Sequence, residues 1–292
     1  MYKFDPQGEP VEMAFRQIAL SQLDEALGEI DRHDGHGRSV VHEVRRRCKK
    51  LRGLLRLVRP AFPEFAGENA AIRDAAALLS HIRDAEVLRL TIDGLGKAQP
   101  EAAEPLTRIS LRLAEEGRHA GPADAGKLEA FRKALLEVRA RAEHWSLTRT
   151  GLDALLPGLR RSYRSDRRRM EKAQRTRLSP DLHEWRKANK AHGFHIDLLK
   201  KTAPEVLTDA LRSVDHVSSL LGHHHDLTVL GAAVAQDPAR FGDEADIAAL
   251  NAAIGAQTAQ LEAAAFDLGR QVLAERPREL ARHFERYWKS AG

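Results

Sequence analysis

The sequence predicts an all-α protein, and three observations point to that fold class. The chain has 292 residues and is rich in Ala, Leu, Arg and Glu, a composition that favours helix over strand. No convincing alternation of apolar and polar residues indicates a strand. Clusters of Gly and Pro divide the chain into segments of helical length, as turns between helices do.

Each segment between two such clusters is expected to form a helix. In chain order, the helices are placed at about residues 10–30, 39–58, 68–94, 101–118, 127–148, 151–175, 180–200, 205–221, 225–236, 243–274 and 277–289. The third of these has a candidate break near Ser80. Ser39 is the candidate N-cap of the second helix, and Asp181 or Ser179 is the candidate N-cap of the seventh.

A motif that occurs twice indicates an internal duplication. Residues 41–60 read VHEVRRRCKKLRGLLRLVRP, and residues 182–201 read LHEWRKANKAHGFHIDLLKK. A second pair, RDAEVL at 83–88 and HDLTVL at 225–230, follows at nearly the same offset of about 141 residues. Self-similarity at a fixed offset is the signature of a repeated structural unit. Here the unit is roughly half of the chain.

The charge of the chain is nearly balanced in total but unevenly distributed. Lys and Arg number 47 against 42 Asp and Glu, and the pI is about 9.4. Nine Lys and Arg residues stand between Arg38 and Arg59, against the single acid Glu43, and nine stand between Arg160 and Arg177, against two acids. Blocks of one charge repel themselves, so they usually exist to bind an anion.

The helix predicted at 39–58 has an apolar face and an opposite cationic face. The cationic face begins with a histidine and consists of His42, Arg45, Arg46, Lys49, Arg52 and Arg56. Surface helices usually place acids one turn away from their bases, but here the neighbours are like-charged. We therefore interpret this face as an anion-binding surface, and a merely solvated face is the alternative.

The second copy of the motif repeats only the first turns of that cationic face. Its matching residues are His183, Arg186, Lys187 and Lys190. Gly193 and Asp197 then stand where the first copy has Arg52 and Arg56. The predicted helix at 151–175 offers further candidates, which are Arg160, Tyr163, Arg164, Arg167 and Arg168, with the tyrosine hydroxyl as a donor. We expect an asymmetric site in which the first copy dominates.

The repeated H-E-x-R/K helix, the later D-x-x-V-L motif and the basic segment Y-R-x-x-R-R-R at 163–169 together resemble the CHAD family, the conserved histidine α-helical domain. The resemblance covers about residues 10–289. It implies two pseudo-symmetric four-helix bundles with a basic cleft or pore between them that binds inorganic polyphosphate. We accordingly expect a single CHAD domain over 1–292, with a first repeat at 10–125 and a second at 126–290.

The chemistry of the basic residues suits that ligand. Arginine keeps its charge at all physiological pH values and can grip two oxygens at once. A histidine beside such a polyanion is driven toward its charged form, so His42 and His183 are candidate phosphate donors. The sequence therefore predicts a binding protein for polyphosphate that needs no cofactor, and association with polyphosphate granules is a natural extension.

Several residues with reactive side chains are assigned structural roles instead. His192, His195 and the run at 223–225 have metal-ligating side chains, but no Cys or H-E-x-x-H motif accompanies them, so no metal site is expected. Asp84 and Asp226 are expected to hold cations of the basic helices rather than to catalyse. No P-loop, nucleophile elbow or Rossmann glycine pattern occurs. We expect no catalytic residues and no enzyme activity.

The remaining sequence features indicate the compartment. Cys48 is the single cysteine and is expected in the core, which fits a reducing environment. The N-terminus lacks the apolar segment of a signal peptide, and no apolar stretch approaches eighteen residues, so no transmembrane helix is expected. These observations predict a cytoplasmic protein that does not bind membranes.

Two other function classes compete with polyphosphate binding. A nucleic-acid-binding protein would also use clustered cations, but single-strand binders need aromatic stacking platforms, and aromatics make up only 5% of the chain. A phosphate-processing enzyme, or an accessory subunit of one, would need metal-ligating carboxylates among the bases, and the basic segments contain few. Chain-length preference, oligomeric state and pathway do not follow from the sequence.

Overall fold

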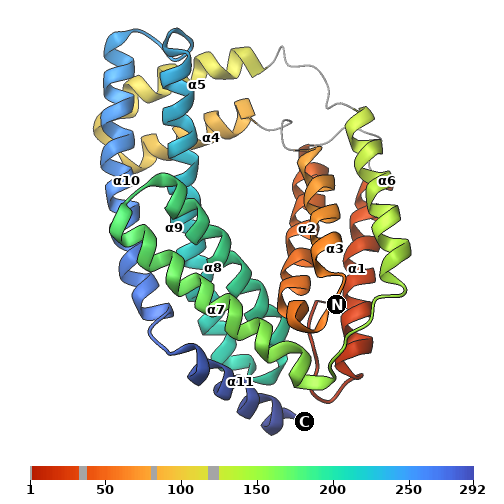
Figure 1. Cartoon of the computed structure of the whole chain (residues 1–292). Helices are drawn as coiled ribbons and strands as arrows, with labels where there is room; N and C mark the ends of the chain where they lie inside the picture. Colours follow the sequence, from red (N-terminus) through yellow and green to blue (C-terminus); the bar gives the residue numbers. More distant parts are fainter. Residues whose placement is uncertain (1, 33–37, 80–83, 118–124) are drawn as a thin grey trace.

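The computed structural model describes residues 2–32, 38–79, 84–117 and 125–292 (Figure 1). Within these residues all regular secondary structure is helical, so the predicted all-α class is confirmed. The helices are α1 (Val11–Asp31), α2 (Arg38–Val58), α3 (Phe65–Ala77), α4 (Asp84–Ala98), α5 (Ala103–Gly117), α6 (Ala125–Ala142), α7 (Gly151–Thr176), α8 (Ser179–Leu199), α9 (Pro204–Gln236), α10 (Glu244–Val272) and α11 (Pro277–Ala291).

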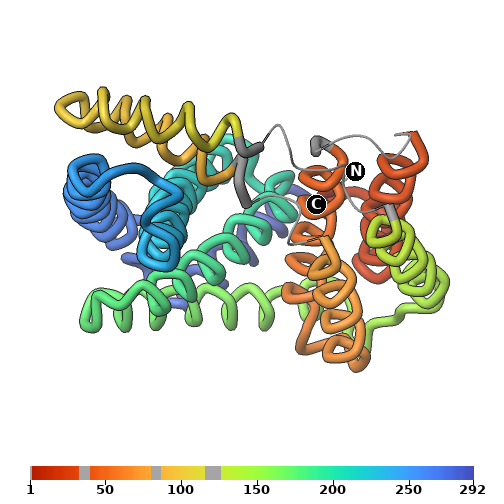
Figure 2. The backbone as a smooth tube through the Cα atoms, turned by 90° about the horizontal axis from the view of Figure 1, so that it is seen from above, coloured from red at the N-terminus to blue at the C-terminus, as the bar shows by residue number. Residues whose placement is uncertain are grey.

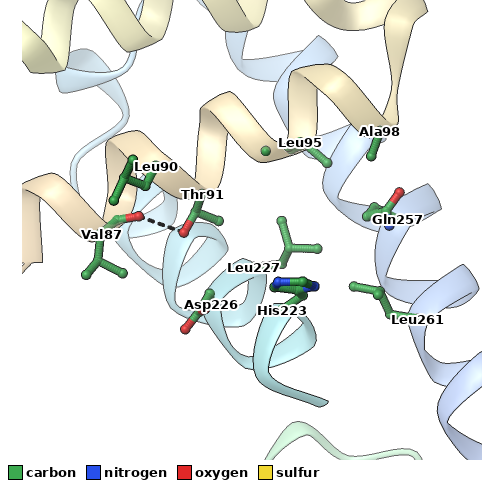
Figure 3. A pocket seen from close by; sticks show the side chains of 11 residues that line it. Val87, Leu90, Thr91, Leu95, Ala98, His223, Asp226, Leu227, Gln257 and Leu261 are labelled. Atoms are coloured by element: carbon green, nitrogen blue, oxygen red, sulfur yellow. Dashed lines mark hydrogen bonds between the residues drawn. The ribbon is translucent and has the colours of Figure 1, made fainter. Parts of the chain in front are cut away.

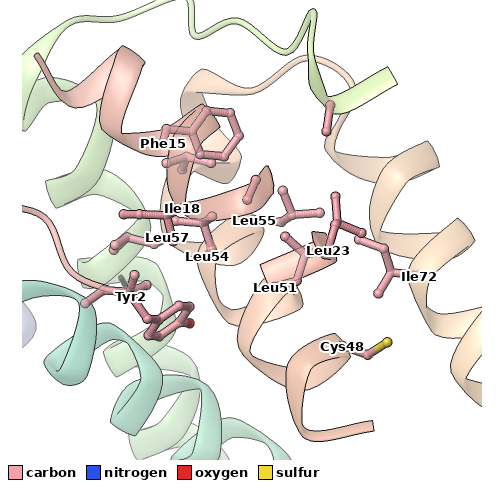
Figure 4. Close-up of a cluster of buried hydrophobic side chains, with 14 of the residues drawn as sticks. Tyr2, Phe15, Ile18, Leu23, Cys48, Leu51, Leu54, Leu55, Leu57 and Ile72 are labelled. Carbon is pink, nitrogen blue, oxygen red and sulfur yellow. The ribbon is translucent and has the colours of Figure 1, made fainter. Parts of the chain in front are cut away.

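The helices pack in two sets that share one core. The helices α1, α2, α3 and α6 pack against one another, and α7 to α10 form a second set with α11 against α7 (Figures 1 and 2). The helix α2 joins the sets because it also packs against α7 and α8. One hydrophobic cluster accordingly contains Phe15 and Leu54 from the first set and Leu155 and Leu198 from the second. Figure 4 shows its part around Phe15, Leu54 and Leu57.

The helices α4 and α5 leave the first set and pack on the second. They form a hairpin that lies against α9 and α10 at the upper left of Figure 1. A separate hydrophobic cluster at this contact includes Ile92 of α4, Ile109 of α5, Leu230 of α9 and Leu250 of α10. Burial of these side chains holds a hairpin from the N-terminal half on helices from the C-terminal half.

The long helix α9 corrects the sequence prediction of two helices at 205–221 and 225–236. Residues 204–236 form one continuous helix, and Gly222 and the histidine run lie inside it. A single glycine costs a helix only about 1 kcal/mol, and Leu221, His224 and Leu227 are all buried on the packed face of α9. Tertiary packing therefore outweighs the local break signal.

Other helix ends also differ from the prediction. The helix α6 ends at Ala142 rather than near 148, because the chain turns to place Trp145 against Phe15, with ring centroids 5.8 Å apart. The segment predicted at 68–94 consists of α3 and α4 as separate helices, while the candidate break at Ser80 lies outside the described residues.

The proposed N-caps of the basic helices are wrong for α8 and undecided for α2. Helix α8 starts at Ser179, and its N-cap, Leu178, makes no side-chain cap. Asp181 lies inside the first turn, where its carboxylate accepts from the Thr176 hydroxyl and pairs with Lys172. Ser39 lies within α2, and its side chain is outside the described residues.

Two glycines allow α2 to approach α7 and α8 of the second set closely. A Cβ at Gly158 of α7 would lie 1.7 Å from the carbonyl oxygen of Leu57, so no other residue fits there without a shift of the backbone. A Cβ at Gly53 would lie 2.7 Å from Cβ of Phe194 in α8. The Gly53 carbonyl also lies 3.1 Å from Nε2 of the buried His195. These contacts fix the junction at which the cationic side chains gather.

Candidate anion-binding site

A cavity of about 230 Å³ lies where the C-terminal end of α2 meets α7 and α8. Five of the side chains that line it are cationic, two are hydroxyls and one is a carboxylate. The lining residues, which we call the basic pocket, are Arg56, Arg59, Arg161, Ser162, Ser165, Arg169, Glu184, Lys187, Ala188 and Ala191. The basic pocket is thus a concave surface with a strong excess of positive charge.

Helical spacing brings these residues to one place. Arg161, Ser165 and Arg169 recur every fourth residue, so they share one face of α7. Ala188 and Ala191 of α8 carry small side chains and leave room for the long cations around them. The close contact at Gly158 sets α7 against the end of α2, which brings Arg56 within reach of the same space.

Arg56 lies in an unfavourable electrostatic environment. Burial, together with the nearby charges of Arg52, Arg169 and Arg59, lowers the pKa of its guanidinium to about 10. In the described part of the chain no carboxylate offsets these charges at Arg56. A half-buried cation surrounded by other cations is stabilised by any anion that enters the pocket.

The single carboxylate of the pocket is already paired. Glu184 accepts from Nζ of Lys187 at 2.7 Å and also from Arg169, and these contacts hold its pKa below the ordinary value. Arg59 lies over the Phe65 ring, 4.6 Å from the centroid. Arg161 makes neither a hydrogen bond nor an ion pair with any described residue. Arg56, Arg59 and Arg161 are therefore the pocket cations that no described carboxylate neutralises.

The predicted cationic face of α2 is only partly gathered at this pocket. Arg56 lines it, whereas Arg52 donates to Oδ1 of Asn69 at 3.1 Å and Arg45 donates to the Leu79 carbonyl at 3.0 Å. Arg46 pairs with Glu43 one turn earlier on the helix surface. His42 and Lys49 are exposed and do not line the pocket.

The structure contradicts the role proposed for Tyr163. Its ring is fully buried, and its hydroxyl donates to the Glu275 carbonyl at 3.0 Å. Arg167 donates to the same carbonyl at 2.9 Å. Tyr163 and Arg167 are four residues apart, so they lie on the same face of α7 and point toward the segment before α11. Arg161 lies on a different face of α7. The tyrosine hydroxyl is therefore hydrogen-bonded inside the protein and does not line the basic pocket.

The other predicted bases of α7 lie outside the basic pocket as well. Arg160, Arg164 and Arg168 are exposed and none of them lines it. Arg161 and Arg169 of α7 line the pocket instead, and the sequence did not lead us to predict either of them as a site residue. The signal that could have found them is the small residues Gly158, Ser162 and Ser165, which mark the face of α7 that another helix approaches.

In the second copy of the motif, Lys187 lines the pocket and the other bases face α9. The rings of His183 and His225 lie 4.2 Å apart between centroids. Burial, together with the nearby charges of His225, Lys187 and Arg186, lowers the pKa of His183 to about 4, although Glu184 opposes the shift. His183 is therefore neutral near pH 7 in the absence of an anion.

Carboxylates of α9 accompany the bases of α8. Burial lowers the pKa of Arg186 and of Lys190, while Asp226 opposes the shift at both and Asp215 opposes it at Lys190. This agrees with the structural role expected for Asp226. The side chain of Asp84, its match in the first repeat, lies outside the described residues.

Packing explains why the second copy departs from the basic pattern. A Cβ at Gly193 would lie 3.2 Å from Cγ1 of Val214, so α9 occupies the space that a long cationic side chain would need. Asp197 acts on Lys50, whose pKa it raises against the effect of burial. The positions that match Arg52 and Arg56 thus serve contacts between helices.

Asp226 also borders a second cavity, of about 450 Å³, between α4, α9 and α10 (Figure 3). Its walls are mostly apolar, with Leu90 and Leu95 on one side and Leu261 on another. Among the described residues that line it, His223 and Asp226 are the ionisable ones. None of the predicted cationic residues lines it. This cavity lacks the charge that an anion site requires.

No metal centre is found among the described residues, since no group of three or more His, Cys, Asp or Glu side chains could hold an ion there. The buried histidines have other neighbours: Nε2 of His195 meets the Gly53 carbonyl, and Nε2 of His224 lies 3.1 Å from Oε1 of Glu262.

None of the described helices is long and apolar enough to cross a lipid bilayer.

Comparison with known protein families agrees with the repeated basic helix and the all-helical architecture. The chain belongs to the CHAD-domain family, whose model matches residues 20–235. This match includes α2 to α8 and α9 as far as Ala235, and therefore every residue of the basic pocket, but not α10 or α11. No curated protein and no solved structure matches the chain.

Proposed function

We propose that this protein binds inorganic polyphosphate at the basic pocket and does not turn it over. The observation that carries the proposal is Arg56, a half-buried guanidinium whose pKa is lowered to about 10 by burial and by neighbouring cations. A polyphosphate chain supplies closely spaced negative charge without bases, so it neutralises several of these cations at once. Membership of the CHAD-domain family supports the same ligand.

The ligand path proposed here continues from the basic pocket along α8. Lys187 lines the pocket, and its charge is also felt by His183 on the adjoining face of the same helix. Arg186 and Lys190 follow on that face. A linear polyanion that leaves the pocket at Lys187 meets these bases next, so both copies of the motif contribute to one basic surface.

The proposal includes a pseudo-twofold relation between the repeats, with α2 and α8 as equivalent helices. Gly53 and Phe194 occupy matching positions of the duplicated motif, and they contact each other across the α2–α8 junction. Contact between equivalent positions is what a twofold axis produces. At the same offset of about 141 residues, the pair α3 and α4 corresponds to α9, and α5 to the N-terminal part of α10, in two pseudo-symmetric four-helix bundles.

The alternative of nucleic-acid binding is less favoured by the pocket. None of its lining residues is aromatic, whereas sequence-independent binding of single strands relies on stacking of bases. Phosphate-processing chemistry is less favoured because Glu184 is the one carboxylate of the lining, and Arg169 and Lys187 hold it. We extend the proposal to a cytoplasmic protein that accompanies polyphosphate granules.

Competition binding tests the ligand class. Labelled polyphosphate is bound to the protein at fixed salt, and unlabelled polyphosphate, single-stranded DNA and double-stranded DNA are added at equal phosphate concentration. We expect polyphosphate to displace the label at least about tenfold more effectively, a difference of about 1.4 kcal/mol. Equal displacement by either DNA contradicts the proposal. Release of orthophosphate with Mg²⁺ or Mn²⁺ present contradicts binding without turnover.

A further inference from the structure

The C-terminal helix α11 has a basic face that the proposed function does not use. Residues 276–289 contain five Lys and Arg against two Glu, whereas the preceding stretch 236–275 contains two Arg against seven Asp and Glu. From residue 236 onward, the excess of positive charge is therefore confined to α11 and the residue before it. A block of one charge on a surface is suited to a partner of the opposite charge.

Three arginines of α11 form a stripe on the side that faces away from the protein. The helix packs against α7 along the lower edge of the molecule in Figure 1, and it buries Phe284, with Leu280 and Trp288 packed beside it. The arginines recur every fourth residue on the opposite face of the helix. These exposed residues, which we call the α11 stripe, are Arg278, Arg282 and Arg286.

The α11 stripe is not neutralised by the described part of the protein. None of its three arginines makes a hydrogen bond or an ion pair with a described residue. Other exposed arginines differ, since Arg73, Arg212 and Arg270 each pair with an aspartate within three residues along the chain. Like charges one helical turn apart destabilise a helix, so an anion that spans the stripe relieves their repulsion.

The two acids of α11 already have partners. Glu285 accepts from Nζ of Lys289 at 2.7 Å, and the Glu279 carboxylate accepts from the backbone N–H of Arg276 at 3.2 Å. A surface cavity of about 430 Å³ lies among these side chains, and the last two arginines of the α11 stripe line it. The guanidinium groups beside this cavity are therefore available to an anion from solution.

The α11 stripe and the basic pocket lie on different sides of α7. The segment that leads into α11 lies over the face of α7 that contains Tyr163 and Arg167. Arg161 and Ser165, which line the basic pocket, are on another face of the same helix. The two basic surfaces are therefore separate, and each can hold its own segment of a polyanion.

We propose that the α11 stripe binds a second strand of polyphosphate, so that one protein molecule holds two strands together. This inference rests on the proposed function, because the basic pocket holds the first strand. Each guanidinium can donate two parallel hydrogen bonds to phosphate oxygens, and the spacing of one helical turn lets a linear polyanion contact the three arginines in sequence. The exposed stripe binds more weakly than the pocket, because salt screens exposed charges most.

Bridging of this kind suits a protein that accompanies a dense phase of polyphosphate, since two linked binding surfaces hold a polymer more firmly than one. Nucleic acid is the less favoured occupant. Binding of single strands relies on stacking of bases on aromatic side chains, and Phe284, Tyr287 and Trp288 of α11 pack against the core instead. The α11 stripe also lies outside the matched residues 20–235, so it is a feature of the C-terminal part of this chain.

A two-strand capture assay tests the inference. Polyphosphate fixed to a bead is loaded with the whole protein, washed, and exposed to a limiting amount of labelled free polyphosphate. Retention of the protein reports the first strand, and retention of the label reports bridging. We expect both. No retention of protein overturns the proposed function and this inference with it, whereas retention of protein without label overturns this inference alone.

Matched variants assign the bridging to α11. The α11 variant replaces all three arginines of the stripe with alanine, and it should stay on the bead but capture at least about tenfold less label. The control variant removes three exposed bases of α4, α5 and α6 and should capture as much label as the unmodified protein. Its substitutions are Lys97→Ala, Arg112→Ala and Lys133→Ala.

Three results with these proteins overturn the inference. Full capture by the α11 variant, or an equal loss in the control variant, removes the assignment to the α11 stripe. Loss of the α11 variant from the bead contradicts the separate role of the pocket. Capture of labelled DNA as efficiently as labelled polyphosphate, at equal phosphate concentration, overturns the choice of ligand.

Discussion

The two copies of the basic motif lie in different electrostatic surroundings, although their first turns match in sequence. In α2, Arg45 and Arg52 donate to neutral oxygens of Leu79 and Asn69, and Arg56 is surrounded by cations. The carboxylate of Asp74 acts on Arg52, but it already pairs with Arg73. In α8, Arg186 and Lys190 lie close to carboxylates of α9. The first copy therefore retains positive charge that the second copy partly neutralises. A cationic pattern predicts an anion site only where acids of the opposing helix do not already compensate the bases.

The largest expected effect concerns the contact that places the first copy beside α7. Gly158→Ala should destabilise the protein by at least about 3 kcal/mol, the upper end of the usual range for overpacking, because the new Cβ meets the Leu57 carbonyl at 1.7 Å. Urea unfolding measures the change in the free energy of unfolding.

Gly231→Ala in α9 is the matched control for that variant. No atom lies within 4 Å of an added Cβ there, so alanine should stabilise the helix by roughly 0.5–1 kcal/mol. Equal stabilities of the Gly158→Ala variant and the unmodified protein would mean that α7 does not touch α2 as described.

The comparison between the copies is tested by two double variants of equal charge change. Arg52→Ala with Arg56→Ala should weaken polyphosphate binding more than Arg186→Ala with Lys190→Ala, because α9 already compensates the second pair. We expect a loss of at least about tenfold for the first, since one charged hydrogen bond contributes roughly 1.5–3 kcal/mol. Affinities across a salt series measure both.

A single variant sharpens the reason for this asymmetry. Asp226→Asn removes the carboxylate that opposes the pKa shifts of Arg186 and Lys190, so it should raise polyphosphate affinity.

Arg47→Ala serves as the control for the two double variants, because Arg47 pairs with Glu25 of α1. A larger loss in the second-copy double variant than in the first would reverse the assignment of the dominant copy.

A smaller effect is expected from pH, through His183. Its pKa is about 4 in the folded protein, against an ordinary value of 6.5. Without ligand, its contribution to stability is fully present above pH 6.5 and is lost as the pH falls toward 4. A bound polyanion favours the charged ring, so affinity for long polyphosphate should rise over the same fall in pH. Calorimetry should detect proton uptake on binding below pH 6.5, and His183→Asn should reduce it.

The sequence predicted the all-α class and most of the helices because apolar periodicity and Gly or Pro breaks act locally. It failed at Gly222, where burial of Leu221, His224 and Leu227 keeps α9 continuous. It also failed at Trp145, where an aromatic contact with Phe15 ends α6 early. In both places a contact between distant segments outweighs the local signal.

The candidate site was predictable only in part, for a related reason. Arg56 and Lys187 were expected, since each belongs to a cationic face of the duplicated motif. Arg161 and Arg169 were missed because the sequence does not reveal which face of α7 meets α2. The face of α7 that we predicted instead contains Tyr163 and Arg167, and both of these side chains donate hydrogen bonds to the Glu275 carbonyl. The missing information was the orientation of one helix.

The central claim is that the unneutralised cations of the basic pocket bind polyphosphate, and one pair of variants tests it most directly. Arg56→Ala with Arg161→Ala removes two pocket charges, whereas Arg160→Ala with Arg164→Ala removes two exposed charges of α7 outside the pocket. Polyphosphate affinity is measured for both across a salt series. We expect the pocket variant to lose at least about tenfold in affinity, with a shallower salt dependence, and the control to lose much less. An equal or larger loss in the control would contradict the account.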